Sequence, residues 1–255
     1  MKFLVLKKRT LLFVFCLMLV AVMLSLNIVG NPSAGVFLGQ VPRLVPIYAV
    51  DTNEKKVAIT FDSAWGADKT LKILELLKEY NINATFFLVG FWVDKYPDMV
   101  KAINEQGVEI GTHSNTHPDF ANLSAEQMKL ELTTSVEKIE NITGKKVELF
   151  RPPYGSYNNT LINTASGLNL KTIQWSVDTL DWKGLSGSQM LNRVLAKIGN
   201  GGIILCHNNS DNILDGLKLI LESLTKSGYQ FVSVGDLIYK NGYTIDNLGI
   251  QRKNN

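Results

Sequence analysis

Strand-like and helix-like segments alternate along most of this chain, and this alternation limits the folds open to it. Short apolar runs such as 57–61 and 84–89 are each followed by stretches in which apolar residues have helical spacing, as in 71–77. Such an alternation is typical of a mostly parallel sheet covered by helices. With about seven strands expected, a closed or nearly closed (β/α) barrel fits better than an open doubly wound sheet.

Local signals mark further elements. Pro97 begins a helix that Gly107 ends, and residues 124–127 form a capping-box pattern that opens a helix ending near Gly144. No glycine-rich dinucleotide or phosphate loop follows any of the expected strands. The other expected strands are 47–50, 108–111, 147–150, 170–177, 203–206 and 230–232, and the other expected helices are 159–165, 188–198 and 213–227.

The N-terminal segment differs in character from the rest. A basic flank ending in Lys7-Lys8-Arg9 precedes residues 11–29, a run of 19 residues without a charge. That is about the length that crosses a bilayer, and a basic flank stays in the cytoplasm. We therefore expect residues 1–9 to be cytoplasmic and residues 10–29 to form an uncleaved transmembrane anchor. The small residues 33–35 leave a cleaved signal peptide, and hence a secreted protein, as the alternative.

The remaining domain boundaries follow from composition. Residues 30–44 contain prolines and glycines and are expected to be a linker, and residues 45–240 are expected to form one domain outside the cytoplasm. Residues 241–255 are expected to be a loose polar tail. Four of the 26 basic residues lie in the N-terminal flank, so the remainder carries 22 basic and 23 acidic residues. No basic block is present, and we expect no nucleic-acid partner. Cys16 and Cys206 are expected to be buried thiols rather than a disulfide.

Ionisable side chains follow the expected strands where each strand ends. Because the carboxyl ends of parallel strands meet at one face of such a fold, we expect these groups to form one site. Two histidines four residues apart can bind one metal ion if the chain turns there. The set therefore favours a metal-assisted acid–base hydrolase. The residues are Asp62, His113, His117, Arg151, Asp178, Asp181 and His207.

Each of these residues taken alone has a simpler interpretation. Asp62 could cap a helix, Arg151 could be a surface cation, and His207 could be a satisfied core imidazole. The pair His113 and His117 could be surface histidines in a polar loop. It is their joint position at the strand ends that favours a site.

The ordered motifs resemble those of the polysaccharide deacetylase family, the NodB-homology domain of carbohydrate esterase family 4. The resemblance covers about residues 45–240. The expected membrane anchor, the lead-in 45–61 and residues 62–66 are most similar to the sporulation-associated PdaB-like branch. The motifs are Thr60-Phe61-Asp62, His113-Ser114-Asn115-Thr116-His117, Arg151-Pro152-Pro153-Tyr154-Gly155, Asp178-Thr179-Leu180-Asp181-Trp182 and Leu205-Cys206-His207.

The resemblance implies a distorted (β/α) barrel that hydrolyses N-acetyl groups from a cell-wall glycan, with peptidoglycan as the expected substrate. His113 and His117 would bind a divalent metal, zinc in many relatives, and Asp62 would be the general base, oriented by Arg151. His207 would be the general acid. The remaining implied roles are tuning of the acid by Asp178 or Asp181, oxyanion stabilisation by the Tyr154 backbone N–H, and lining of the acetyl pocket by Trp182 and Leu205.

One position departs from the family pattern. Ser63 stands where the family usually has a second aspartate, which is the third metal ligand. A neutral hydroxyl is a poorer ligand than a carboxylate, so metal affinity should fall, and the nearby Asp68 is a possible substitute. Two functions therefore stay open: a monomeric, anchored, metal-dependent deacetylase, and a catalytically weak or inactive protein of the same fold that binds cell-wall glycan. A eukaryotic chitin deacetylase is disfavoured because no cysteine-rich binding module is present.

Overall fold

The computed structural model describes residues 8–30 and 42–254, which belong to two compact units, 1–43 and 44–255. Helix α1 (Lys8–Gly30) is the described part of the first unit. Nowhere in the described ranges does a helix combine the length and apolar character that crossing a bilayer requires. The helix predicted at 10–29 is thus present, but its assignment as a transmembrane anchor is unsupported. Most of the predicted linker, and residues 1–7 of the predicted flank, lie outside the described residues.

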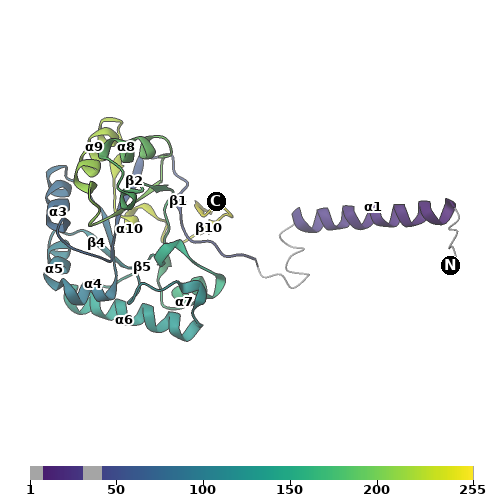
Figure 1. Ribbon diagram of the computed structural model, residues 1–255, viewed down its shortest axis with the longest axis horizontal. Coiled ribbons are helices and arrows are strands. Elements are labelled where there is room, and N and C mark those ends of the chain that lie inside the picture. Colours follow the sequence, from purple (N-terminus) through teal and green to yellow (C-terminus); the bar gives the residue numbers. More distant parts are fainter. Residues whose placement is uncertain (1–7, 31–41, 255) are drawn as a thin grey trace. The chain divides into compact units, whose positions relative to one another are not determined.

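A parallel sheet runs through the second unit (Figure 1). Its strands follow the order β6-β5-β4-β3-β2-β8-β7, and β9 pairs with the first residues of β2. This row of seven parallel strands forms a half-barrel, which confirms the predicted α/β class and strand number. The strands are β2 (Lys56–Ser63), β3 (Thr85–Leu88), β4 (Glu109–Thr112), β5 (Leu149–Phe150), β6 (Lys171–Thr172), β7 (Val177–Asp178), β8 (Ile203–His207) and β9 (Gln230–Phe231).

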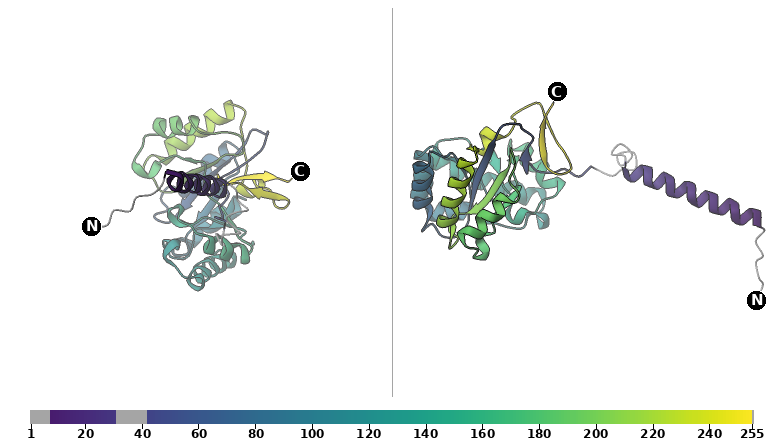
Figure 2. Two further views of the ribbon diagram at one scale, coloured as in Figure 1. Left: turned by 90° about the vertical axis from the view of Figure 1, so that its right-hand side faces the viewer. Right: turned by 90° about the horizontal axis from the view of Figure 1, so that it is seen from above.

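Helices surround this sheet (Figures 1 and 2). The predicted capping box is present, since the Ser124 hydroxyl accepts from the Gln127 N–H and the Gln127 side chain accepts from the Ser124 N–H. Gly144 ends that helix with φ of 65°, a conformation that glycine adopts without strain. The helices are α3 (Thr70–Glu79), α4 (Gly90–Lys95), α5 (Pro97–Glu105), α6 (Ala125–Thr143), α7 (Asn159–Gly167), α8 (Gly187–Leu195), α9 (Ile213–Lys226) and α10 (Val234–Leu237).

Strand β2 lies in the middle of the core. All its residues after Lys56 are buried, and Phe61 stacks on Phe86 of β3 with ring centroids 4.8 Å apart. Strand β2 pairs with β3 on one side and β8 on the other. A strand covered on both faces and paired on both edges cannot shift its register without exposing apolar area. The end of β2 is therefore a rigid place for functional side chains.

The prediction of one continuous strand at 170–177 is wrong, because this stretch contains two separate strands. Its first part, β6, pairs with β5 at one end of the row, whereas β7 pairs with β8 at the other end. Between them the backbone turns to other partners, because Ile173 bridges to Ile47 and the Ser176 N–H donates to the Ile203 carbonyl. The apolar pattern is continuous, but the hydrogen bonding is not.

The expectation of a loose tail at 241–255 is also wrong. Strands β10 (Tyr243–Ile245) and β11 (Ile250–Lys253) form a second, three-stranded sheet with β1 (Ala49–Val50). Figure 2 shows β10 and β11 in yellow. Gln251 is fully buried there, and its amide bonds both the N–H and the carbonyl of Tyr239. The polar composition of this stretch gives no sign of the strands, because the buried Gln251 amide finds its hydrogen-bond partners in another segment, at Tyr239.

Candidate active site

The predicted site residues meet around one cavity of about 710 Å³ at the carboxyl ends of the strands. The register of β2 against β8 makes Asp62 and His207 direct partners. Arg151 and Ser63 are fully buried and do not line the cavity. The predicted residues that do line it are Asp62, His113, His117, Tyr154, Asp178, Asp181, Trp182, Leu205 and His207.

Asp62 is held in a fixed orientation by Arg151. The Arg151 Nη1 donates to Asp62 Oδ1 at 2.7 Å and to Thr60 Oγ1 at 2.8 Å, and Nη2 donates to the Gln174 carbonyl at 3.1 Å. Burial alone would raise the pKa of the Asp62 carboxyl, but the adjacent Arg151 charge holds that pKa below its ordinary value. Asp62 is therefore an ionised carboxylate whose other oxygen is free of the guanidinium.

That second oxygen faces His113. The His113 Nδ1 lies 2.7 Å from the Arg151 carbonyl oxygen, and because a carbonyl only accepts, Nδ1 carries the proton. The other ring nitrogen, Nε2, lies 3.5 Å from Asp62 Oδ2. Burial lowers the pKa of His113, so the ring is neutral at pH 7 and Nε2 presents a lone pair to a carboxylate oxygen. Two acceptors facing one another favour a cation or a hydrogen-bond donor at this place.

His117 completes a pair of neutral imidazoles. Its ring centroid lies 4.9 Å from that of His113, and its Nδ1 is buried without a hydrogen-bond partner. Burial first, and then the neighbouring His113, lower the pKa of His117 to about 4. A neutral imidazole with an unpartnered nitrogen is suited to bind a metal ion.

The turn that carries both histidines is held from helix α6. Glu131 Oε2 accepts from the N–H groups of Asn115 and Thr116 at 2.9 and 2.8 Å, and Oε1 accepts from the Thr116 hydroxyl at 2.7 Å. The turn needs such support, because Ser114 and His117 have φ of 73° and 60°, which are unfavourable for residues with a side chain. Sequence reasoning missed Glu131, and a lone glutamate on a helix face gives no signal for this role.

The donor set fits a metal ion in part. The imidazoles of His113 and His117 fit two ligand positions, and Ser63 Oγ is a buried hydroxyl without a partner. Within the described ranges, however, no group of three His, Cys, Asp or Glu side chains is placed to hold a metal. Asp68 does not supply the third ligand, since it is exposed and does not line the cavity.

His207 also lines the cavity and is bound by Asp181. Its Nδ1 lies 2.9 Å from Asp181 Oδ1, and its backbone N–H donates to Asp181 Oδ2 at 2.6 Å. Burial alone would lower the pKa of His207, but the Asp181 hydrogen bond and charge raise that pKa above its ordinary value. Asp178 instead accepts from the Leu180 N–H at 2.8 Å. The geometry thus assigns the tuning contact to Asp181 rather than Asp178.

The cavity walls are aromatic and apolar. Tyr154 has φ of 59°, and its ring packs edge-on against His117 with centroids 4.7 Å apart. Leu205 is nearly buried, whereas Trp182 is 57% exposed. Trp65 and Trp175 also line the cavity, and sequence reasoning assigned a role to neither.

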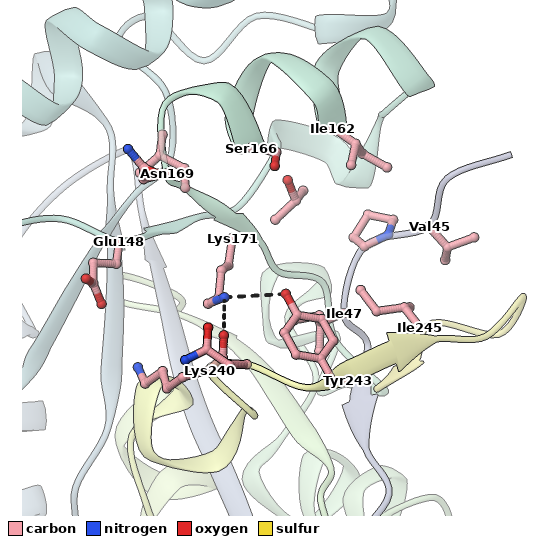
Figure 3. Close-up of a pocket in the computed structure, with 14 residues that line it drawn as sticks. Val45, Ile47, Glu148, Ile162, Ser166, Asn169, Lys171, Lys240, Tyr243 and Ile245 are labelled. Carbon is pink, nitrogen blue, oxygen red and sulfur yellow. Dashed lines mark hydrogen bonds between the residues drawn. The ribbon is translucent and has the colours of Figure 1, made fainter. Parts of the chain in front are cut away.

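A second cavity, of about 420 Å³, collects none of the predicted site residues (Figure 3). It lies near the starts of β5 and β6, away from the carboxyl ends of the strands. Lys171 donates there to the Lys240 carbonyl and to the Tyr243 hydroxyl, at 3.2 and 3.4 Å. The Lys171 ammonium is thus occupied by bonds within the fold, whereas the predicted site residues are gathered at the first cavity.

Comparison with known proteins gives consistent results. The family model described as polysaccharide deacetylase matches residues 49–173. The uncharacterised protein YlxY of Bacillus subtilis is 35% identical over 193 residues, which are 76% of this chain and 60% of that protein. A peptidoglycan-N-acetylglucosamine deacetylase of Bacillus cereus is 36% identical over 186 residues, 71% of this chain and 68% of the relative. The chain therefore spans less than two thirds of YlxY.

Solved structures include relatives of both catalytic and non-catalytic kinds. A carbohydrate esterase family 4 pseudoenzyme from Bacillus anthracis superposes with a TM-score of 0.74 at 35% identity, covering 78% of this chain and 70% of that one. A mutant of that pseudoenzyme with restored enzymatic activity also superposes with a TM-score of 0.74, at 36% identity, covering 78% of this chain and 73% of that one.

Proposed function

Because the chain belongs to the polysaccharide deacetylase family, we propose that its second unit hydrolyses N-acetyl groups on a cell-wall glycan, with peptidoglycan as the substrate. One observation carries this proposal: an ionised carboxylate, Asp62, and a histidine of raised pKa, His207, are register partners on neighbouring strands at one cavity. Paired groups with opposite pKa shifts suit a base and an acid acting on one bond.

The proposed reaction is acid–base hydrolysis of the acetamide. Asp62 takes a proton from water as the water oxygen attacks the acetyl carbon. The developing oxyanion is stabilised by the backbone N–H of Tyr154. His207 then protonates the amine nitrogen as the C–N bond breaks, which gives acetate and a free amino sugar. Arg151 keeps the Asp62 carboxylate ionised and oriented, and Asp181 favours the protonated form of His207.

The apolar side chains of Leu205 and Trp182 line the cavity beside these groups and are proposed to accept the acetyl methyl. Zinc or another divalent metal is part of the proposal. His113 and His117 would bind it, and it would supply positive charge beside the acetyl carbonyl.

A second candidate function is glycan binding without efficient turnover. Ser63 favours it, because the hydroxyl stands at the position of a family carboxylate and no three-residue metal group exists among the described residues. The similarity to a Bacillus anthracis pseudoenzyme supports the same alternative. A pure binding protein, however, needs neither an oriented carboxylate nor a histidine of raised pKa, so the enzyme is the preferred proposal.

Acetate release distinguishes the two functions. The purified full chain, with its metal content measured, is incubated with muropeptides and with intact glycan strands that contain N-acetylglucosamine and N-acetylmuramic acid. Release of acetate that falls when metal is removed supports the enzyme. Binding of the same glycan without acetate at any metal concentration supports the second candidate. Mass analysis of the products identifies which sugar loses its acetyl group.

We further propose that this unit works outside the cytoplasm as a monomer. The glycan lies there, and a basic flank before the uncharged run 11–29 is typical of exported proteins. Protease treatment of intact protoplasts, or recovery of the protein from the medium, tests the location. A second unit that resists protease until the cells are lysed would contradict it. A role in sporulation rests on the PdaB-like resemblance of residues 62–66, and expression confined to sporulating cells would support it.

A further inference from the structure

The exposed aromatic side chains of the second unit lie at one place. In the described part of this unit, the large apolar side chains with high exposure comprise four leucines and three aromatic residues. The aromatic residues are Trp65, Tyr154 and Trp182, exposed by 64, 69 and 57%, and all three line the active-site cavity. The four leucines do not line it. Exposed apolar area concentrated at one cavity is typical of a binding surface.

Trp65 is exposed and yet held in position. Its ring packs edge-on against His117, with centroids 4.8 Å apart, and against Phe91 at 6.3 Å. The next residue, Gly66, has φ of 69°, and its carbonyl accepts from Trp92 Nε1 at 2.7 Å and from Asn208 Nδ2 at 3.0 Å. A ring fixed in this way loses little conformational entropy when a ligand packs on it.

The backbone at Gly66 makes this placement possible. A Cβ atom added to Gly66 would lie 2.1 Å from Nδ2 of the Asn209 side chain, and the φ of 69° is unfavourable for a residue with a side chain, so glycine suits this turn. Among the hydrogen bonds of the described residues, none uses the Trp65 indole N–H. That donor is therefore available to a hydroxyl group of a ligand.

We propose that Trp65 forms a further saccharide subsite of the cavity, which binds the pyranose ring next to the one that carries the reacting acetyl group. This inference rests on the proposed function, because a glycan is the ligand. The apolar C–H face of the sugar would pack on the indole, and a sugar hydroxyl would accept from the indole N–H. Trp65 lies beside His117, whereas Trp182 follows Asp181, the partner of His207. The two indoles thus lie near different groups of the site, Trp65 at His117 and Trp182 at Asp181. The proposed cavity takes at least two consecutive sugars.

Calorimetric titration with the monomer and the pentamer of N-acetylglucosamine tests this subsite, with released acetate measured in parallel. The pentamer is expected to bind the wild-type full chain more tightly than the monomer. Trp65→Ala should weaken pentamer binding about tenfold, which corresponds to ~1.4 kcal/mol, and leave monomer binding unchanged. Trp65→Phe should retain most of the affinity. Leu130→Ala is the matched control, since this exposed leucine does not line the cavity.

Three results would overturn the subsite. One is unchanged pentamer binding in Trp65→Ala, and another is an equal loss in Leu130→Ala. The third is an equal loss for monomer and pentamer together with weaker zinc binding, which would show that Trp65 only supports His117. If the wild type binds neither saccharide and releases no acetate from muropeptides, both the subsite and the proposed glycan function are wrong. Acetate release from muropeptides without binding of the pentamer removes the subsite alone. If the wild type binds the pentamer and Trp65→Ala binds it equally well, only the subsite is wrong.

Discussion

Asp181 binds His207 through both of its carboxylate oxygens, one to the ring Nδ1 and the other to the backbone N–H. Because the side chain of Asp181 is fully buried and that of His207 is about one third exposed, the carboxylate is the fixed member of the pair. The contact leaves Nε2 as the ring nitrogen available to a leaving amine. It also sets the ionisation of the proposed acid, since the Asp181 charge favours the protonated ring.

Replacement of Asp181 by asparagine should therefore shift the pH dependence of activity. Burial would then lower the pKa of His207 without the opposing carboxylate, so the protonated acid would be present only at lower pH. The alkaline limb of the plot of kcat/KM against pH should move to lower pH. Asp178→Asn is the matched control, because Asp178 influences His207 through its charge but without a hydrogen bond. Equal shifts in the two variants would contradict the assignment of Asp181.

The proposed base and acid should differ in what their removal does to stability. Asp62→Asn and His207→Ala are each expected to lower turnover by about 10²–10⁴-fold. Asp62, however, is the buried partner of the fully buried Arg151, so Asp62→Asn leaves an uncompensated charge in the core. Removing one member of a buried ion pair typically destabilises by about 3–5 kcal/mol. His207→Ala should change the free energy of unfolding far less.

Urea denaturation of both variants, alongside acetate release, checks this contrast. Assays of Asp62→Asn must be made at a temperature where the variant is folded. Wild-type acetate release from either variant would exclude the proposed role of that residue. Equal and small losses of stability in the two variants would show that the buried charge of Arg151 does not need Asp62 for compensation.

Much of this fold and site was predictable from the sequence because the signals are local. The runs of apolar residues predict the strands. Because the carboxyl ends of parallel strands lie at the same end of the sheet, the residues that end or follow the strands, such as Asp62, His113 and His207, were expected together. The capping box at Ser124 requires residues only three positions apart. Each of these inferences uses neighbouring residues alone.

The features that were missed depend on partners far apart in the chain. Glu131 supports the histidine turn from another helix, and Gln251 is buried against Tyr239 in a stretch that reads as polar. The run 170–177 divides between β6 and β7 because its middle pairs with other segments: Ile173 with Ile47, and Ser176 with Ile203. Trp65 gave no signal, since an exposed indole and a buried one look alike in a sequence.

Glu131 is expected to be a positioning residue for the histidine pair. Glu131→Gln replaces a charged acceptor by a neutral amide. This weakens the two bonds from the backbone N–H groups and reverses the third, since the amide N–H can only donate to the Thr116 hydroxyl. Hydrogen bonds to a charged group are worth about 1.5–3 kcal/mol each. The variant should lose stability of this order and bind zinc more weakly than the wild type. Thermal unfolding and zinc titration measure both effects.

Glu137→Gln is the control for this substitution, because Glu137 is exposed on the same helix α6. It should change neither quantity. A loss of stability in Glu131→Gln with unchanged zinc affinity would show that Glu131 holds the helix to the loop without orienting the imidazoles.

Ser63→Asp is expected to complete the metal site. A carboxylate at this position adds an anionic oxygen beside the two imidazoles, and its Coulomb attraction to the cation should tighten zinc binding about tenfold or more, ~1.4 kcal/mol per factor of ten. Without metal the same carboxylate is a buried charge next to Asp62, so the apo-protein should be less stable than the wild type. Zinc should then raise the midpoint of thermal unfolding more in the variant than in the wild type.

Ser63→Asn separates charge from size, because asparagine has nearly the shape of aspartate without its charge. The asparagine variant should not gain zinc affinity. If Ser63→Asp leaves zinc affinity unchanged, the third ligand is supplied elsewhere and Ser63 is not at the metal position. If it binds zinc more tightly but releases no acetate from any N-acetylated glycan, then metal supply is not what limits catalysis. In that case glycan binding becomes the better description of this protein, because Asp62 and His207 would then be oriented, ionised as required and supplied with metal, and still unproductive.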